Sequence, residues 1–380
     1  MEINELRQQI NDIDGQLARL FAQRMDAALE IAQYKKENNL PVLDRSRERQ
    51  VLARVAELVG EPYEQYSRVL WNTLFDLSRS YQNKALCQGS QLEERIGQAL
   101  ERTPQLFPAK AAVAVQGVEG AYSQQACDKL FSLPSILYFS QFEGVFQAVR
   151  EGLCRYGILP IENSSAGSVT AVYDLMKKYN FHIVRSIKLK VDHALLVNPG
   201  ARLEDIREIV SHDQGLSQCS EFLKQHPEIK AIPMPNTAAA AQFVAQSGRK
   251  DLAAVSSRSC AQLYGLQTLL ENFQNSDHNY TRFICISKDL EIYPGANKIS
   301  LMLTLPHQPG SLYNLISRFS ALGLNLTKLE SRPMPGKDFE FMFYFDFDAS
   351  CYAPETAAML GSLSRDLESF TFLGSYSEVF

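Results

Sequence analysis

The first 34 residues carry apolar side chains at helical spacing over a length that few isolated globular domains use. The row consists of Ile3, Leu6, Ile10, Ile13, Leu17, Leu20, Ala28 and Ile31. Most members lie three or four residues apart, which places them on one face of a helix that Pro41 stops. A helix well over 25 residues long is unusual in a lone domain, so we expect it to pair with another chain.

Composition limits the classes of protein to which the chain can belong. At roughly 100–200 residues per domain, 380 residues suggest two or three domains. No apolar run approaches the roughly 18 residues of a membrane helix, and the N-terminus is too charged for a signal peptide. A formal charge of -5 argues against a general nucleic-acid binder. The seven cysteines are scattered without a CxxC pair, which predicts no disulfide framework, no metal site and a cytoplasmic location.

The N-terminal part of the chain is predicted to be all-helical. This first domain covers 1–90, with a second helix from after Asp44 to near Gly60 and a third over about 63–86. Residues 91–110 are polar and contain two prolines, so we interpret them as a linker that includes a helix.

The rest of the chain alternates strands with helices. Residues 111–290 hold short apolar runs, each followed by a helical stretch, which predicts α/β architecture. The runs are 111–115, 156–161, 193–197, 208–210 and 252–256. Residues 297–375 predict β-α-β-β-α-β, the ferredoxin-like order, and therefore a third, α+β domain. Its strands are 299–305, 324–333, 339–347 and 370–375, and its helices are 312–322 and 354–368.

Polar side chains interrupt the apolar faces of all three N-terminal helices. They are Arg7, Arg24, Lys35, Asp44, Arg47, Glu48, Ser78 and Gln82. A single buried cation is most simply explained by a structural ion pair. Three helices with polar groups on their buried faces instead indicate a polar pocket inside a helical bundle. Several cations beside a carboxylate, a hydroxyl and an amide would suit a small dianion.

Four stretches of this domain resemble the helical chorismate mutase family. They are LRQQI (6–10), AQR (22–24), YKKENNLPVLDRSRE (34–48) and SRSYQ (78–82). The resemblance implies that the two carboxylates of chorismate are held by Arg7, Arg24 and Arg47. It implies that Lys35 and Gln82 donate hydrogen bonds to the ether oxygen of chorismate. It also implies contacts to the ring hydroxyl, or ordering of the site, by Glu48, Asp44 and Ser78. This pericyclic rearrangement needs no nucleophile or cofactor, because binding the reactive conformer and stabilising charge on the breaking C–O bond supply the rate.

Arg7 and Arg24 are too far apart on one helix to share a small substrate. They are 17 residues apart, or about 26 Å at the helical rise per residue. Chorismate is roughly 8 Å across by covalent dimensions. If both arginines contact one substrate they come from different chains, so we expect an isologous dimer with two composite sites.

In the middle domain, the loops between strands and helices are rich in hydroxyls and amides. They are GVEGAYS (117–123), ENSSAGS (162–168), SHDQ (211–214), NTAAAA (236–241) and SS (256–257). Each alone is an ordinary helix N-cap. Five in one domain favour a site where helix N-termini gather around an anion.

Three motifs over 111–287 resemble prephenate dehydratase: GxxGAYS, PIENSSAGS and NYTRF (279–283). The resemblance implies two α/β lobes, like periplasmic binding proteins, and loss of carbon dioxide and hydroxide from prephenate to give phenylpyruvate. It marks Thr281 as essential, through its hydroxyl at the leaving oxygen. Threonine is too weak an acid to be a matched general acid, so we expect polarisation by a hydrogen bond. Further substrate contacts are expected from Glu162, Asn163, Ser164, Ser211, Gln218 and Arg282.

The C-terminal domain resembles the ACT family of small regulatory modules. PGSLYNLI (309–316) follows its first strand and LESRP (329–333) ends its second. By residue type alone these are a capped helix and a strand-end arginine, but both motifs in register favour a regulatory site. The resemblance implies phenylalanine binding by Gly310, Ser311, Leu312, Glu330, Ser331 and Arg332.

The three resemblances, in this order, indicate the bifunctional chorismate mutase–prephenate dehydratase family. Such a chain is an isomerase and a carbon–oxygen lyase of L-phenylalanine biosynthesis, inhibited by phenylalanine, with no cofactor and no nucleic-acid or membrane partner. We expect a homodimer or a higher homo-oligomer. A mutase joined to prephenate dehydrogenase would need a G-x-G-x-x-G string, which is absent. A non-catalytic sensor with solute-binding and ACT modules would not need the cations of the first domain.

Overall fold

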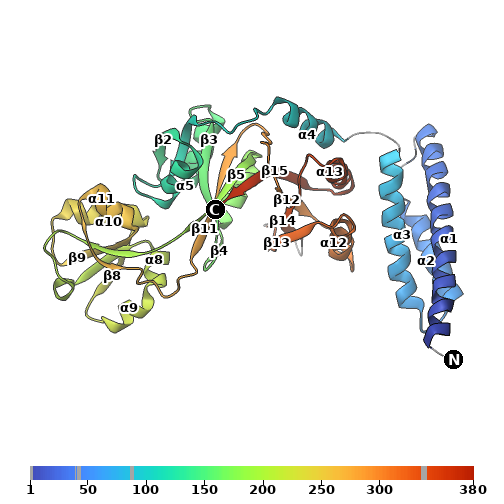
Figure 1. The fold of residues 1–380 in the computed structure, drawn as a ribbon, viewed down its shortest axis with the longest axis horizontal. Helices are drawn as coiled ribbons and strands as arrows, with labels where there is room; N and C mark the ends of the chain where they lie inside the picture. The colour runs from blue at the N-terminus through green and yellow to red at the C-terminus, as the bar shows by residue number, and fades with distance from the viewer. Residues whose placement is uncertain (1–2, 39, 41–43, 86–89, 335–339) are drawn as a thin grey trace.

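The chain folds into three units (Figure 1). The computed structural model describes residues 3–38, 40, 44–85, 90–334 and 340–380. Pro41, Cys87 (one of the seven cysteines) and Phe339 (the first residue of a predicted strand) lie outside the described residues. Figure 1 shows a helical unit at one end, a unit with two sheets at the other, and a C-terminal unit between them. Within the described ranges, no helix has the length and apolar character needed to span a bilayer.

The helical unit consists of α1 (Ile3–Glu37), α2 (Arg45–Val59) and α3 (Glu64–Ala85), close to the predicted bounds. The carboxylate of Asp44 caps α2 by accepting a hydrogen bond from the backbone N–H of Arg47 (2.9 Å). Both α1 and α2 pack against α3. The buried apolar side chains of the three helices include Ala28, Ala32, Val55, Ala56 and Phe75.

The apolar row of α1, which was predicted to pair with another chain, is largely exposed within one chain. From Ile3 to Leu20 its members are 39% to 61% exposed, and the buried residues of α1 are Ala28 and Ala32. The reason is length: α1 has 35 residues, whereas α3 has 22 and α2 has 15. The N-terminal part of α1 therefore presents a long apolar surface to its surroundings.

Part of the predicted linker is a helix that belongs to the C-terminal unit. α4 (Gln91–Arg102) begins with a capping box between Ser90 and Glu93. Its apolar face, formed by Leu92, Ile96 and Ala99, joins the core of the C-terminal unit. Gly361 of α13 (Pro354–Asp366) lets α4 approach closely, because a Cβ at that position would collide with Ser90 and Glu93.

The first lobe of the middle unit is built on β1 (Lys110–Gln116), β2 (Leu133–Phe139), β3 (Tyr156–Asn163), β4 (Gly167–Ser168), β5 (His182–Lys190) and β11 (Tyr280–Ser287). Its helices are α5 (Tyr122–Leu130), α6 (Phe142–Arg150) and α7 (Thr170–Tyr179). The strand order is β5-β11-β3-β1-β2, and β4 pairs with β3. The buried faces of β3 and β11 are almost continuously apolar, as expected of strands covered on both sides.

The second lobe holds a separate five-stranded sheet in the order β10-β6-β9-β7-β8. Its strands are β6 (Ala194–Val197), β7 (Glu208–Ser211), β8 (Lys230–Pro233), β9 (Leu252–Ser256) and β10 (Gln267–Glu271). Its helices are α8 (Asp213–Gln218), α9 (Ser220–Gln225), α10 (Thr237–Ser247) and α11 (Arg258–Tyr264), with a 3-10 turn at Leu203–Asp205. The chain passes between the lobes twice, through 191–193 and 272–279.

The C-terminal unit has the predicted β-α-β-β-α-β order. It comprises β12 (Lys298–Thr304), α12 (Ser311–Ala321), β13 (Asn325–Pro333), β14 (Phe341–Asp348), α13 and β15 (Phe370–Val379). The strand order is β13-β14-β12-β15. β15 runs beyond its predicted end at 375, and its residues 377–379 pair in parallel with β5. The sheet of the first lobe and that of the C-terminal unit are therefore continuous.

Candidate active sites

One polar cluster lies between α1 and α3. Arg24 Nη1 donates to Ser78 Oγ (2.5 Å) and to the Leu74 carbonyl (3.3 Å), and its guanidinium lies 5.7 Å from the centre of the Phe75 ring. Burial lowers the pKa of Arg24, yet a guanidinium stays charged at neutral pH. The structure thus brings the predicted residues Arg24 and Ser78 into contact, with the cation held against an aromatic ring.

An ion-pair group joins α2 to α3 near this cluster. Glu48 pairs with Arg79, which also pairs with Asp76. Arg79 was not among the predicted site residues, although its spacing of three residues from Asp76 is that of a helical ion pair. Asp76 Oδ2 and Gln82 Oε1 are buried without a hydrogen-bond partner among the described residues. Such atoms mark a place where a ligand can supply the missing partner.

Four further predicted chorismate ligands lie on α1 and at the start of α2. Lys35 is half-buried on α1, Asp44 caps α2, and Arg47 is exposed. Arg7 is exposed near the start of α1, 17 residues before Arg24 on the same helix. Within a single chain Arg7 therefore cannot share a small ligand with Arg24.

A second group of predicted residues lies where β3 ends and β11 begins. The strands are antiparallel, with Thr281 opposite Asn163 and Arg282 opposite Glu162. Asn163 Nδ2 donates to Thr281 Oγ1 (2.9 Å). Asn163 is buried, whereas Thr281 is half-buried. The hydroxyl of Thr281 is therefore held by an amide from the neighbouring strand.

The loop 164–168 and the second lobe contribute the other predicted polar groups. Ser164 Oγ donates to the His278 carbonyl (3.0 Å) and accepts from the Tyr280 N–H (2.9 Å), so it secures the start of β11. Gln218 lies at the end of α8 and bonds to the residue before Tyr280, Asn279 (3.0 Å). The hydroxyl of Ser211 is fully buried and donates to the Val255 carbonyl (2.7 Å), which ties β7 to β9.

Glu162 and Arg282, two of the predicted substrate contacts, pair with residues of the C-terminal unit. Successive side chains of a strand point to opposite faces, so these two leave the face that carries Asn163 and Thr281. Arg282 is 8% exposed at its side chain and donates to Asp346 of β14 (2.6 Å). Although burial lowers it, the pKa of Arg282 is held well above its usual value by Asp346. Glu162 pairs with Lys328 of β13 (3.2 Å). Both residues bind the C-terminal unit.

Comparison with known proteins identifies the family of the chain. The family model of chorismate mutase type II matches residues 6–83, and that of prephenate dehydratase matches 113–291. The bifunctional chorismate mutase/prephenate dehydratase of Escherichia coli (strain K12) is 31% identical over 379 residues, covering 98% of this chain and 95% of that protein. The chain belongs to this family. The result confirms the family predicted from the sequence motifs and leaves the sensor alternative without support.

Other relatives match about 70% of the chain. Arogenate dehydratase 2 of Petunia hybrida is 36% identical over 281 residues, covering 70% of this chain and 71% of that protein. The structure of prephenate dehydratase from Arthrobacter aurescens in complex with L-Phe has a TM-score of 0.64 and 28% identity, covering 70% of this chain and 90% of that one. The middle unit of the chain is thus a prephenate dehydratase domain, and the helical unit is a chorismate mutase domain.

The residues predicted to bind phenylalanine lie at the start of α12 and on β13. Gly310, with a φ of 85°, precedes Ser311 and Leu312 at the start of α12. On β13, Glu330 accepts from Ser168 Oγ of the dehydratase domain (2.5 Å) and pairs with Arg332 (2.7 Å). Ser331, between them, is exposed. Glu330 therefore links the predicted effector strand directly to the dehydratase domain.

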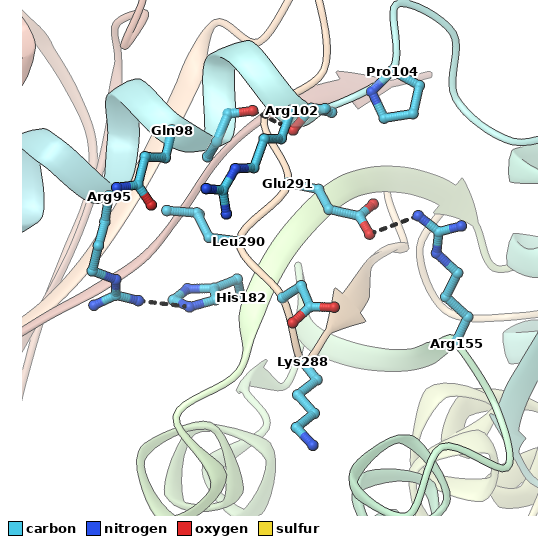
Figure 2. A pocket seen from close by; sticks show the side chains of 12 residues that line it. Arg95, Gln98, Arg102, Pro104, Arg155, His182, Lys288, Leu290 and Glu291 are labelled. Atoms are coloured by element: carbon cyan, nitrogen blue, oxygen red, sulfur yellow. Dashed lines mark hydrogen bonds and ion pairs between the residues drawn. The ribbon is translucent and has the colours of Figure 1, made fainter.

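A cavity of about 440 Å³ lies away from Thr281, between α4, β5 and the segment 288–291. Figure 2 shows Arg95 directed at His182 and Arg155 directed at Glu291. Arg95 Nη2 lies 3.3 Å from His182 Nε2, and His182 Nδ1 lies 3.2 Å from the Phe372 carbonyl. Because an arginine only donates, His182 Nε2 accepts and the ring is neutral. Burial, followed by the nearby Arg95, lowers the pKa of His182 to about 4.

Proposed function

We propose that the chain converts chorismate to prephenate in its helical domain and prephenate to phenylpyruvate in its middle domain, under inhibition by L-phenylalanine. The hydrogen bond from Asn163 to Thr281 carries the assignment of the dehydratase site. This bond holds the oxygen of a hydroxyl group at the strand pair that the NYTRF and PIENSSAGS motifs share.

In the mutase domain, Arg24, Lys35 and Arg47 hold the carboxylates and the ether oxygen of chorismate together with Gln82. The burial of the Gln82 side chain beside this cluster and the cation held by Ser78 support this assignment. These groups act by selecting the compact conformer and stabilising negative charge on the ether oxygen as its C–O bond breaks. Glu48 and Asp44 order the site through Arg79 and the start of α2.

The mutase site is completed by Arg7 of a second copy of the chain. The apolar row of α1, exposed from Ile3 to Leu20, supports an antiparallel pairing of two such helices across a two-fold axis. In such a pair the N-terminus of one α1 lies beside the middle of the other. Arg7 of one copy then reaches the cluster of Arg24 and Ser78 in its partner.

In the dehydratase domain, Thr281 acts on the hydroxyl group that leaves the ring of prephenate. Its oxygen already accepts from Asn163, so its own proton is free to be donated to the leaving oxygen. As the carboxylate carbon departs as carbon dioxide, its bonding electrons enter the ring and the C–O electrons leave with hydroxide. The hydrogen bond stabilises the charge that grows on this oxygen. Water supplies the proton that neutralises hydroxide, because threonine is too weak an acid.

The C-terminal unit is an ACT regulatory domain that binds phenylalanine through Gly310–Leu312 and Glu330–Arg332. Three observations support the proposal: the ferredoxin-like strand order, the L-Phe complex of the Arthrobacter relative, and the contact between Glu330 and Ser168. A cytoplasmic location is supported by the free thiols of the six cysteines in the described ranges.

Chorismate supplied alone, without any added cofactor, tests the two activities together. We expect phenylpyruvate as the product, detected by its absorbance in alkali. Accumulation of prephenate without phenylpyruvate would remove the dehydratase assignment, and unchanged chorismate would remove the mutase assignment.

Substitution of Thr281 tests the dehydratase site. Thr281→Ala should lower dehydratase turnover by about 10²–10³-fold, the range for loss of one donor to a developing oxyanion. Mutase turnover in the same chain should stay within about twofold, because the two sites lie in different domains. Thr281→Ser keeps the hydroxyl and should retain most of the dehydratase activity. Equal loss of both activities in a folded Thr281→Ala variant would contradict separate sites.

A further inference from the structure

Two buried side chains outside the predicted site lie in the segments that join the two lobes. His193 belongs to the first segment (191–193) and Asn279 to the second (272–279), and each is 2% exposed. His193 Nε2 lies 2.8 Å from Gln218 Oε1. Asn279 contacts both Gln218 and Asn163. The two residues therefore touch predicted site residues of both lobes.

The orientation of the first amide follows from the backbone. Asn163 Oδ1 accepts from the N–H groups of Ser165 (3.0 Å) and Ala166 (2.9 Å), which can only donate. Asn163 Nδ2 therefore faces the other way and donates. Its two hydrogens go to Thr281 Oγ1 and Asn279 Oδ1, each at 2.9 Å.

The same logic fixes the next two side chains. Because Asn279 Oδ1 accepts from Asn163, its Nδ2 is the donor toward Gln218 Oε1 (3.0 Å). Gln218 Oε1 is an acceptor, so His193 Nε2 must carry the proton that it shares with this oxygen. Every group from His193 to Thr281 thus has one orientation, set by two backbone N–H groups.

The network also crosses the boundary between the lobes. Asn163 and Thr281 belong to the first lobe, and Gln218 belongs to the second. The two connecting segments are bonded to one another through Val191 N–H and the Asn279 carbonyl (2.7 Å). A substitution of Asn279 or His193 therefore changes a network that contains residues of both lobes.

We propose that Asn279 and His193 are positioning residues for the dehydration of prephenate. Asn279 accepts the second hydrogen of the Asn163 amide and so holds this amide, already oriented by two backbone N–H groups, against Thr281 Oγ1, which leaves the proton of Thr281 free to be donated to the leaving oxygen. His193 and Asn279 together hold Gln218 of the second lobe toward the same place. The inference rests on the proposed role of Thr281, and neither residue need touch prephenate.

Asn279→Ala tests the proposal against a matched control, Asn275→Ala. Asn275 is an asparagine of the same connecting segment, and its side chain bonds to Glu221 N–H and Ser220 Oγ instead. In Asn279→Ala we expect dehydratase kcat to fall about tenfold or more with KM within about threefold, and in Asn275→Ala we expect both within about twofold. Combining Asn279→Ala with Gln218→Ala should cost less than the product of the two single effects.

A folded Asn279→Ala variant with wild-type kcat, or an equal loss in Asn275→Ala, would overturn the proposal. Thr281→Ala is measured alongside to separate the two ideas. If Thr281→Ala is inactive and Asn279→Ala is unaffected, the positioning role fails alone. If Thr281→Ala keeps its activity, the proposed site fails.

Two variants of His193 decide the question if thermal unfolding shows that Asn279→Ala does not fold. His193→Gln places an amide donor at the position of Nε2, whereas His193→Leu removes the donor at similar volume. We expect His193→Gln to retain several-fold more dehydratase kcat than His193→Leu. Equal rates in the two folded variants would show that the donor to Gln218 has no role and would overturn the proposal.

Discussion

Thr281 and Arg282 are consecutive residues with separate surroundings. The hydroxyl of Thr281 accepts from Asn163, while Arg282 is buried against Asp346 of the C-terminal domain. The same division holds on the opposite strand, where Asn163 joins Thr281 and Glu162 joins Lys328. At this strand pair, one face carries the proposed chemistry and the other carries contacts between domains.

The buried side chain of His182 should make the free energy of unfolding depend on pH. Its pKa is lowered to about 4 by burial, with Arg95 as the second cause, whereas an unfolded histidine binds a proton near pH 6.5. As pH falls from about 6.5 toward 4, the histidine binds a proton in the unfolded chain but stays neutral in the folded chain. This group alone should therefore reduce the free energy of unfolding by about 2 kcal/mol at pH 5 relative to pH 7.5.

Urea unfolding at these two pH values checks this prediction. The loss at pH 5 should be smaller in His182→Gln than in the wild type. His307→Gln removes an exposed histidine of the C-terminal domain and serves as the control. The same pH dependence in His182→Gln and the wild type would refute the prediction.

At the scale of elements, the packing of α4 against α13 depends on a glycine. A Cβ at Gly361 would collide with Ser90 and Glu93, which form the capping box of α4. Gly361→Ala should therefore displace these two side chains, break the capping box and destabilise the chain by about 1 kcal/mol, as loss of a helix cap does. Gly97→Ala is the matched control: this glycine lies within α4, has open space around its Cβ position, and should gain about 0.5–1 kcal/mol in helix propensity. Thermal unfolding of both variants measures the difference, and equal stability would contradict the packing role.

Periodicity predicted the elements better than it predicted their partners. The helices of the first domain and the β-α-β-β-α-β order appear at nearly the expected bounds because each has a strong local pattern. The helix α4 was predicted to be part of a linker but packs on the C-terminal unit, since a pattern shows which face is apolar and not what covers it. For the same reason, motifs found Thr281 and Asn163 but could not show that Arg282 turns toward Asp346.

At the scale of the whole molecule, the proposed regulatory site and the dehydratase domain meet at Glu330. Glu330 accepts a hydrogen bond from Ser168 and pairs with Lys328. Lys328 also pairs with Glu162, which precedes Asn163 on β3. A ligand at β13 therefore has a direct electrostatic route to the strands of the dehydratase site.

Glu330→Ala should raise the phenylalanine concentration needed for half-inhibition by about tenfold or more, equivalent to a coupling or affinity loss of about 1.4 kcal/mol. Turnover without phenylalanine should change less. Glu368→Ala removes an exposed carboxylate from the same domain and should leave inhibition as in the wild type. Inhibition curves for the three proteins provide the measurement, and an unchanged curve for Glu330→Ala would move the effector site elsewhere.

The proposed dimer predicts that two inactive mutase variants restore each other. In Arg7→Ala and Arg24→Ala homodimers, every composite site lacks one arginine. A mixed dimer has one site that lacks both and one that is intact. Random exchange makes about half of the dimers mixed, so about a quarter of wild-type mutase activity should return.

The control mixture combines Arg24→Ala with Glu48→Ala. Arg24 contacts Ser78, and Glu48 pairs with Arg79, so both bind α3 of their own chain and belong to the same half of a site. Every site in this mixture has one defect, and no activity should return. Recovery with Arg7→Ala but not with Glu48→Ala is the outcome that a shared site requires. If neither mixture recovers despite proven subunit exchange, Arg7 does not act across the dimer, and its place on the exposed face of α1 serves only the pairing of the helices.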